Sequence, residues 1–252
     1  MPKIVILWTD AALWLLAAAL VAYVVFVRRR PNLRASWRKV FMDAPAMCSS
    51  IVLLLCLGVT LLDSVHYRPL LPPAPGATAA AYDPRTRSLL DAVLWDLVQS
   101  REKTYSRPLA TVSFTRESEE VDGRLQRVAP RLAHGGAHLK NPEAEWLGDV
   151  VARAATGAAA GVAVAALLSA LLILLLARAG RQAFGACAQE VLQGRSALPW
   201  HAAIGTLGVL GVVVGMATAL SGPYHLMGTD TTGNDVLYQS LKSIRTAFVI
   251  GS

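Results

Sequence analysis

Long apolar runs alternate with polar stretches along this chain. A helix that crosses about 30 Å of hydrocarbon needs about 20 mainly apolar residues, each adding about 1.5 Å. Four runs meet that requirement: Ile4–Val27, Ala44–Leu62, Val150–Ala177 and His201–Leu220. A further segment, Val236 to Ile250, places apolar residues on one side of a helix and predicts the start of a fifth membrane helix. The pattern therefore predicts an all-α polytopic membrane protein with four transmembrane helices plus the start of a fifth.

Basic residues predict the orientation of these helices. Residues 28–43 contain six arginines and lysines but one acid, Asp43, and the short connection 178–200 is also rich in arginine. Short loops of this kind stay in the cytoplasm, so the N-terminus is expected on the periplasmic side of a bacterial inner membrane. The first run is not expected to be a signal peptide, because its basic cluster follows the apolar core and the core is long.

Four regions follow from the runs and their connections. They are an N-terminal helical membrane pair over 1–62, a periplasmic insertion over 63–149, a second membrane pair over 150–220 that includes the cytoplasmic connection 178–200, and a loop with the start of the next membrane helix over 221–252.

The insertion is predicted to be mainly helical or irregular. Asp83-Pro84 is typical of a helix start, and apolar residues between Leu89 and Val98 recur at helical spacing, which predicts a helix of about four turns. Residues 111–115 alternate briefly, as a strand would. The pattern His134-Gly135-Gly136-Ala137-His138 favours a flexible glycine turn over a metal site, and Asn141-Pro142 predicts a second helix start.

Two ionisable residues lie at the outer ends of the first two runs. Asp10 is expected to be exposed at the membrane interface, since a charge costs less there than at the bilayer centre. His66 has no partner at metal-ligand spacing, so we interpret it as an interfacial residue and not as a metal ligand.

Small residues predict close contacts between membrane helices. Gly157 and Gly161 form a small-xxx-small face in the third run. Gly205, Gly208, Gly211 and Gly215 form a glycine-rich face in the fourth run. Both faces are expected to lie at helix-packing contacts.

Composition changes this picture little and excludes several functions. Hydrophobic residues make up 54% of the chain and charged residues 16%, so the net charge of +7 points to anionic lipid rather than nucleic acid. The three cysteines form no disulfide framework. We find no nucleophile elbow, zincin helix, phosphate-binding loop or dinucleotide fingerprint, so an enzyme, a metal site and a bound cofactor are not expected.

The most specific segment runs from Tyr224 to Thr246. Within it, Gly228 and Gly233 favour tight or left-handed backbone, Asp230 is suited to cap a following helix, and Asp235 suits the positive start of that helix. An ordinary turn between two membrane helices is the simpler interpretation of these features.

The same segment resembles the entry signature of the C-type permease subunit of peptide and nickel ABC importers. That signature has the form H-x-x-G-T-D-x-x-G-R-D followed by a hydrophobic residue, between the first and second core membrane helices. The matching positions are His225, Gly228, Thr229, Asp230, Gly233, Asp235 and Val236. Asn234 departs from the pattern, because the family usually carries arginine there. The resemblance covers about the last fifty residues.

The resemblance implies a permease subunit of an ATP-driven peptide-type importer that works by alternating access. Its expected partners are a second permease subunit, two ATPase subunits, a periplasmic binding protein and the lipid bilayer, with ATP hydrolysis on the separate ATPase. The chain lacks the family's E-A-A-x-x-x-G coupling helix; Gln182 to Gly185 is a weak likeness of it, and an amphipathic surface helix is favoured there. Two alternatives stay open: a membrane-anchored periplasmic interaction or sensor protein, and an inactive truncated permease.

Overall fold

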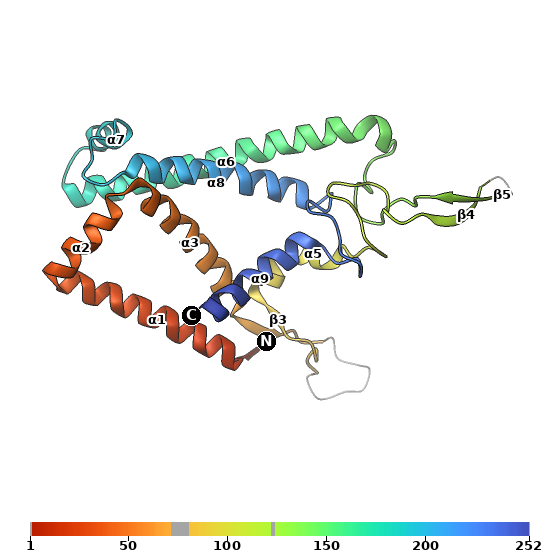
Figure 1. The fold of residues 1–252 in the computed structure, drawn as a ribbon, viewed down its shortest axis with the longest axis horizontal. Helices are drawn as coiled ribbons and strands as arrows, with labels where there is room; N and C mark the ends of the chain where they lie inside the picture. Colours follow the sequence, from red (N-terminus) through yellow and green to blue (C-terminus); the bar gives the residue numbers. More distant parts are fainter. Residues whose placement is uncertain (1, 72–80, 122–123, 252) are drawn as a thin grey trace. The chain divides into compact units, whose positions relative to one another are not determined.

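The protein is mostly helical. The computed structural model describes residues 2–71, 81–121 and 124–251. Figure 1 shows the order of the elements along the chain. Four helices are long and apolar enough to cross a membrane, which confirms the number predicted from the apolar runs: α1 (Trp8–Arg29), α3 (Ala44–Asp63), α6 (Pro142–Gly180) and α8 (Trp200–Ser221).

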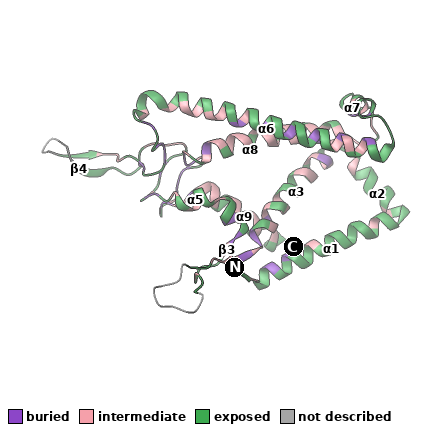
Figure 2. Ribbon diagram, turned by 180° about the vertical axis from the view of Figure 1, so that it is seen from behind, coloured by how far each residue is buried: buried purple, intermediate pink, exposed green. Residues whose placement is uncertain are grey.

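Many apolar side chains of these helices face away from the rest of the protein. Leu15 in α1 is 74% exposed, Leu53 in α3 is 59% exposed and Leu167 in α6 is 71% exposed. Exposed residues therefore run along much of the length of α1 and α6 (Figure 2). Apolar surface on this scale is expected of helices that contact lipid.

The chain forms two compact units, and each is described by itself. The first contains residues 1–34, 53–99 and 238–252, and the second contains residues 35–52 and 100–237. The helix α2 (Pro31–Phe41) lies across one of these divisions, and its Trp37 and Phe41 rings stack at 5.9 Å.

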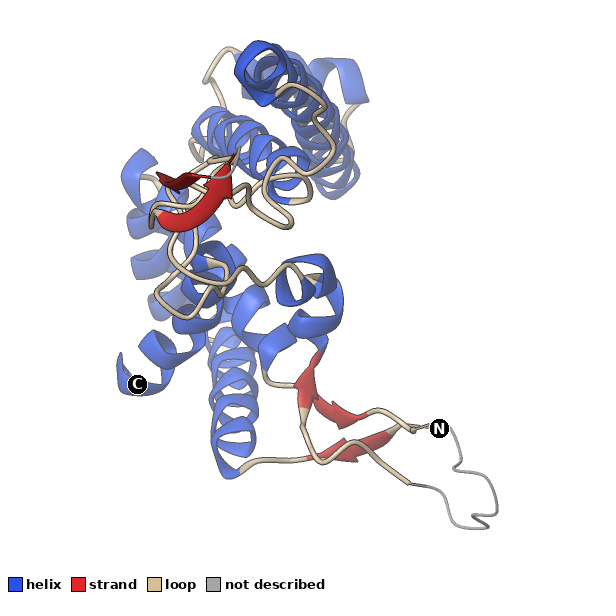
Figure 3. Ribbon diagram, turned by 90° about the vertical axis from the view of Figure 1, so that its right-hand side faces the viewer, coloured by secondary structure: helices blue, strands red, loops and turns tan. Residues whose placement is uncertain are grey.

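A small antiparallel sheet organises the first unit. Its strands are β1 (Lys3–Val5), β2 (His66–Arg68) and β3 (Arg87–Ser88), in the order β1-β2-β3, with Lys3 paired to Arg68 and His66 paired to Ser88 (Figure 3). The sheet brings the residues before α1 next to those after α3. These strands correct the prediction of a chain without sheet structure.

The predicted four-turn helix after Asp83 is replaced by two short helices, α4 (Leu89–Val93) and α5 (Trp95–Gln99). Ser88 is the N-cap of α4: its hydroxyl accepts from the Asp91 N–H, and the Asp91 carboxylate accepts from the Ser88 N–H. Asp83 instead accepts the N–H of Arg85 in a local turn. A reciprocal capping box satisfies two helix-end donors, which explains the later start.

In the second unit, α6 and α8 run side by side (Figure 1). Gly157 and Gly161 of α6 lie against Gly215 and Gly211 of α8, and a Cβ at Gly211 would lie 2.6 Å from the Gly161 carbonyl oxygen. A Cβ at Gly205 or Gly208, by contrast, has no neighbour within 4 Å among the described residues. The close contact therefore involves Gly211 and Gly215 of the predicted glycine face and does not extend to Gly205 and Gly208.

The remaining elements of the second unit are α7 (Phe184–Leu192) and the hairpin of β4 (Glu117–Val121) and β5 (Arg124–Val128). Helix α7 is the surface helix expected in the 178–200 connection, and its buried Cys187 and Val191 pack on Ile173 and Ala177 of α6. The predicted strand at 111–115 is reduced to a single bridge between Val112 and Arg131.

Helix α6 has 39 residues and begins at Pro142, after Asn141, as the sequence predicts. Eight of its residues precede the predicted start of the third membrane run at Val150. The proposed boundary between the insertion and the second membrane pair therefore lies inside one continuous helix. Most described residues of the 63–149 region are helical or irregular, but the region also contributes strands to both sheets, which the sequence did not predict.

Candidate functional site

The signature segment begins directly after α8 with a core contact. The Tyr224 N–H donates to the Leu220 carbonyl, and Tyr224, Leu220 and Leu139 form a buried apolar cluster against which Trp146 packs. The Tyr224 hydroxyl donates to the Asp149 carboxylate at 2.8 Å. This bond ties the segment to the first turns of α6.

Asp149 accepts two further bonds. One comes from Arg153 Nε at 2.7 Å and the other joins its Oδ2 to His138 Nε2 at 2.9 Å. Burial raises the pKa of the Tyr224 hydroxyl, and the adjacent carboxylate raises it further, so Tyr224 remains a hydrogen-bond donor at any physiological pH.

Two glycines allow the segment to fold tightly. Gly228 has φ of 78° and Gly233 has φ of 79°, both in the left-handed region. A Cβ at Gly228 would overlap the Ser106 carbonyl oxygen, and one at Gly233 would overlap the Glu102 carbonyl oxygen. Both conformation and space therefore require glycine at these two positions.

Asp230 closes the turn between them. Its Oδ1 accepts the N–H groups of Thr232 at 2.8 Å and of Asn234 at 2.9 Å. Asp230 thus caps its own turn, directly before the following helix, α9 (Val236–Gly251). Asn234 donates from its side chain to Thr232 Oγ1 at 2.6 Å, so the position where the family has arginine serves the turn here.

Thr229 bonds the turn to residues 104–106 of the insertion. It is fully buried, its hydroxyl donates to the Thr104 carbonyl at 2.9 Å, and it forms an antiparallel bridge with Ser106. Residues more than 120 positions apart in the sequence are paired at this point.

His225 lies between two buried carboxylates. Its Nδ1 is 2.8 Å from Asp235 Oδ2 and its Nε2 is 3.3 Å from Glu102 Oε1. We refer to these three residues as the His225 cluster. Burial alone would lower the pKa of His225, but the hydrogen bonds and charges of Asp235 and Glu102 outweigh it and raise the pKa above 6.5. The geometry favours an imidazolium that donates from both nitrogens.

Glu102 is held by the backbone as well. Its carboxylate accepts the N–H groups of Ala133 at 2.8 Å, His134 at 2.7 Å and Gly135 at 3.1 Å. Burial would raise the pKa of Glu102, yet these three backbone donors and His225 hold it below its usual range. The His134–His138 turn was expected to be flexible, but its first two N–H groups bind the Glu102 carboxylate.

The arrangement is suited to holding structure. In the part of the chain that the structure describes, no three His, Cys, Asp or Glu side chains are placed to bind a metal. His225 uses both ring nitrogens on carboxylates and is therefore unable to act as a base without breaking one of those bonds. All six of the predicted signature residues, His225, Gly228, Thr229, Asp230, Gly233 and Asp235, lie in one hydrogen-bonded framework.

A second group of charges lies in the first unit. Asp10 is 1% exposed; its Oδ2 is 2.8 Å from His66 Nδ1, and its Oδ1 accepts from Arg245 Nη2 at 2.5 Å. His66 is 7% exposed. The prediction that Asp10 is exposed is therefore wrong, because Asp10 is buried and paired with His66 and Arg245.

Helix α9 supplies the bases of this group. Arg245 lies 4.0 Å from Asp63, and Lys242 lies 2.8 Å from Asp91 and 3.9 Å from Asp63. We call Asp10, Asp63, His66, Asp91, Lys242 and Arg245 the Arg245 cluster. Burial would raise the pKa of Asp91, but the hydrogen bonds it accepts, chiefly from Lys242, lower it.

The sequence contained some signals for these clusters and lacked others. An acid within an apolar run, as at Asp10, is itself a sign of a buried partner. Glu102 has no such signal, because its partners are more than 30 residues away and three of them are backbone groups.

Comparison of the chain with protein-family models, with curated proteins and with solved structures finds no match. Function is therefore inferred from the His225 cluster, the Arg245 cluster and the four apolar helices.

Proposed function

We propose that the protein is a permease subunit of an ATP-driven, peptide-type importer in the bacterial inner membrane. In this proposal α1, α3, α6 and α8 cross the bilayer, the N-terminus and the 63–149 insertion are periplasmic, and the connections at 28–43 and 178–200 are cytoplasmic. The basic composition of those two connections supports the orientation.

One observation carries the proposal. The positions that match the importer signature are the ones that build the framework after α8: two glycines with positive φ, a buried threonine, a turn-closing aspartate and a histidine held by a buried acid. An accidental match would place some of these residues on the surface without partners. Each one instead has a physical reason for its residue type.

In this proposal, the hydrogen-bonded segment 224–235 also has a mechanical role. It joins the end of α8 to the start of α9 and fastens both to residues 100–138 through Thr229 and Glu102. In an alternating-access transporter, helices move as groups, and this connection would make α8 and residues 100–138 move together.

ATP hydrolysis is assigned to partner chains. The sequence has no phosphate-binding Gly-Lys-Thr or Gly-Lys-Ser loop. The proposed assembly therefore contains a second permease subunit, two ATPase subunits and a periplasmic binding protein, and this subunit contributes membrane helices to the transport path.

Two measurements on one strain test the proposal. In cells lacking the gene, uptake of radiolabelled di-, tri- and pentapeptides is measured with and without depletion of ATP. We expect the ATP-dependent uptake of at least one size class to fall and to return when the gene is restored. A tagged chain isolated from the membrane of the restored strain is expected to bring with it a phosphate-loop ATPase and a second multi-helix protein. Unchanged uptake together with a chain isolated without an ATPase would overturn the proposal.

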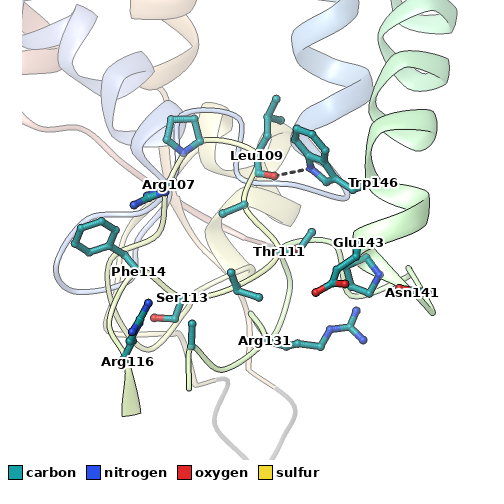
Figure 4. Close-up of a pocket in the computed structure, with 15 residues that line it drawn as sticks. Arg107, Leu109, Thr111, Ser113, Phe114, Arg116, Arg131, Asn141, Glu143 and Trp146 are labelled. Carbon is teal, nitrogen blue, oxygen red and sulfur yellow. Dashed lines mark hydrogen bonds between the residues drawn. The ribbon is translucent and has the colours of Figure 1, made fainter. Parts of the chain in front are cut away.

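A membrane-anchored sensor is the second candidate, and one observation favours it. Residues of the insertion and of the first turn of α6 line an open pocket in the second unit (Figure 4). A sensor would bind a ligand without ATP-dependent uptake, so the uptake measurement separates the two candidates.

A further inference from the structure

The pocket in the second unit has the size of a small-molecule site. Its volume is about 900 Å³, within the range of about 300 to 1,000 Å³ that is typical of ligand pockets. It is lined by residues 107–114, by Arg116, Ala129 and Arg131, and by the start of α6, and none of the three residues of the His225 cluster lines it. A permease function does not require it.

Charge is distributed unevenly around this pocket. Figure 4 shows Arg107, Phe114 and Arg116 along one side and Asn141 and Glu143 on the other. The Arg107 guanidinium lies 5.1 Å from the centre of the Phe114 ring, and Arg107, Phe114 and Arg116 are all exposed. This side therefore presents two guanidinium groups next to an aromatic surface.

The third arginine of the pocket has a structural role. Arg131 Nη2 donates to the Gly136 carbonyl at 3.3 Å and to the Leu139 carbonyl at 2.8 Å. It holds the turn that binds Glu102, so the arginines available to a ligand are Arg107 and Arg116.

The floor between the two sides is mainly apolar. Leu109, Ala110 and Val112 contribute to it, and Trp146 closes one end while its Nε1 donates to the Leu109 carbonyl at 2.9 Å. Val112 is 42% exposed and Phe114 is 55% exposed. An apolar ligand body would remove these surfaces from water.

We propose that this pocket binds a small organic carboxylate with an apolar or aromatic body. Arginine is suited to bidentate recognition of a carboxylate, and its planar group also stacks on aromatic rings. Glu143 on the opposite side repels a carboxylate, so the anionic group lies at Arg107 and Arg116 and the body lies over Val112 toward Trp146.

The length of α6 favours a soluble ligand over a lipid headgroup. Its 39 residues span about 58 Å, whereas about 30 Å of hydrocarbon needs only about 20 residues. Its charged residues Asp149 and Arg153 lie between the pocket and the long apolar part of the helix. The pocket therefore lies beyond these charges and outside the apolar part of the helix.

The test uses the full-length chain in detergent, with binding measured by calorimetry. The probe is N-acetylphenylalanine, the neutral control is N-acetylphenylalaninamide, and short-chain phosphatidylglycerol represents a lipid source. We expect saturable binding of the carboxylate and binding about tenfold weaker, or less, for the amide. Equal binding of acid and amide, no binding of the acid, or tighter binding of phosphatidylglycerol overturns the proposal.

Three variants test which residues bind the carboxylate. Arg116→Gln is expected to weaken binding of the acid about tenfold, whereas Arg127→Gln, on an exposed residue of β5 outside the pocket, leaves it unchanged. Glu143→Gln is expected to strengthen it, an outcome that misfolding does not produce. Equal effects of Arg116→Gln and Arg127→Gln, or weaker binding in Glu143→Gln, contradict the assignment. Loss of peptide uptake in cells plays no part in this test, so the proposed transport function and the pocket fail or stand separately.

Discussion

The His225 cluster and the Arg245 cluster both bury acids beside bases, but they satisfy them differently. Glu102 accepts three backbone N–H groups and His225 bridges two acids over short side chains. In the Arg245 cluster, the bases are the long side chains of α9, and the buried atoms Asp63 Oδ1 and Arg245 Nε have no hydrogen-bond partner among the described residues.

The difference concerns rigidity. Backbone donors are fixed by the fold and lose no side-chain entropy when they bind a carboxylate, whereas a lysine or arginine must be ordered along its whole length. We expect the His225 cluster to behave as one cooperative structural unit and the Arg245 cluster to rearrange when its surroundings change.

Glu102→Ala is expected to cause the largest effect. It leaves three backbone N–H groups and a buried histidine without their acceptor, a loss of about 3 to 5 kcal/mol. Hydrogen exchange of the purified chain should show lost protection at residues 132–136. The matched change Glu117→Ala, on an exposed residue, should alter stability by less than about 0.5 kcal/mol. Retained protection in Glu102→Ala would show that the backbone donors do not depend on the carboxylate.

Gly233→Ala is expected to disturb the His225 cluster through the backbone. A methyl group at positive φ that also overlaps the Glu102 carbonyl is expected to cost about 1 to 3 kcal/mol. The thermal unfolding midpoint in detergent measures it. Gly222→Ala is the control, because Gly222 has φ of −70° and no atom within 4 Å of a built Cβ among the described residues. Equal unfolding midpoints for Gly233→Ala and Gly222→Ala would contradict the requirement for glycine at position 233.

The two clusters are expected to differ in how their stability depends on pH. The pKa of His225 is raised in the fold, so its stabilising contribution is complete below about pH 6.5 and is lost as the pH rises through the folded value, by at most about 1.4 kcal/mol per pH unit. Hydrogen exchange between pH 6 and 9, corrected for intrinsic rates, should show protection falling at residues 132–136. An equal fall over residues 89–99 would mean that the effect is not local to His225.

Lys242→Met should have the smallest effect. Lys242 is 34% exposed, and the Asp91 that it contacts keeps bonds from Tyr238 and the Ser88 N–H, so the expected cost is below about 1 kcal/mol. Raising the salt concentration from 0.15 to 1 M should reduce even this difference. The exposed Lys140 provides the control variant Lys140→Met. A cost above 2 kcal/mol would place the Arg245 cluster in the same rigid class as the His225 cluster.

The sequence predicts what local patterns determine. Continuous apolar runs predict the four long helices, because a membrane-length helix satisfies its own backbone and needs no partner for its hydrogen bonds. The positive-φ glycines and the turn between them also follow from local chemistry, since Gly228 and Gly233 lie in a run with Asp230.

Contacts between distant residues escape such patterns. Nothing near Glu102 indicates that it meets His225, and nothing near Asp10 indicates Arg245, which is 235 residues away. The hairpin of β4 and β5 is missed because Glu117 to Val121 shows no apolar alternation; its strands are held by cross-strand pairing. Spacing alone also does not distinguish Gly211 and Gly215, which contact α6, from Gly205 and Gly208 on the same predicted face.

Helix α6 has one more consequence when it is treated as a lever arm. If the hydrocarbon begins at the predicted start of the third run, Val150, the first eight residues of α6 form a rigid arm of about 12 Å, and a tilt of about 10° displaces its tip by about 2 Å. Asp149, which receives the Tyr224 hydroxyl, lies on that arm. A small rotation within the bilayer is thereby converted into a displacement of the insertion.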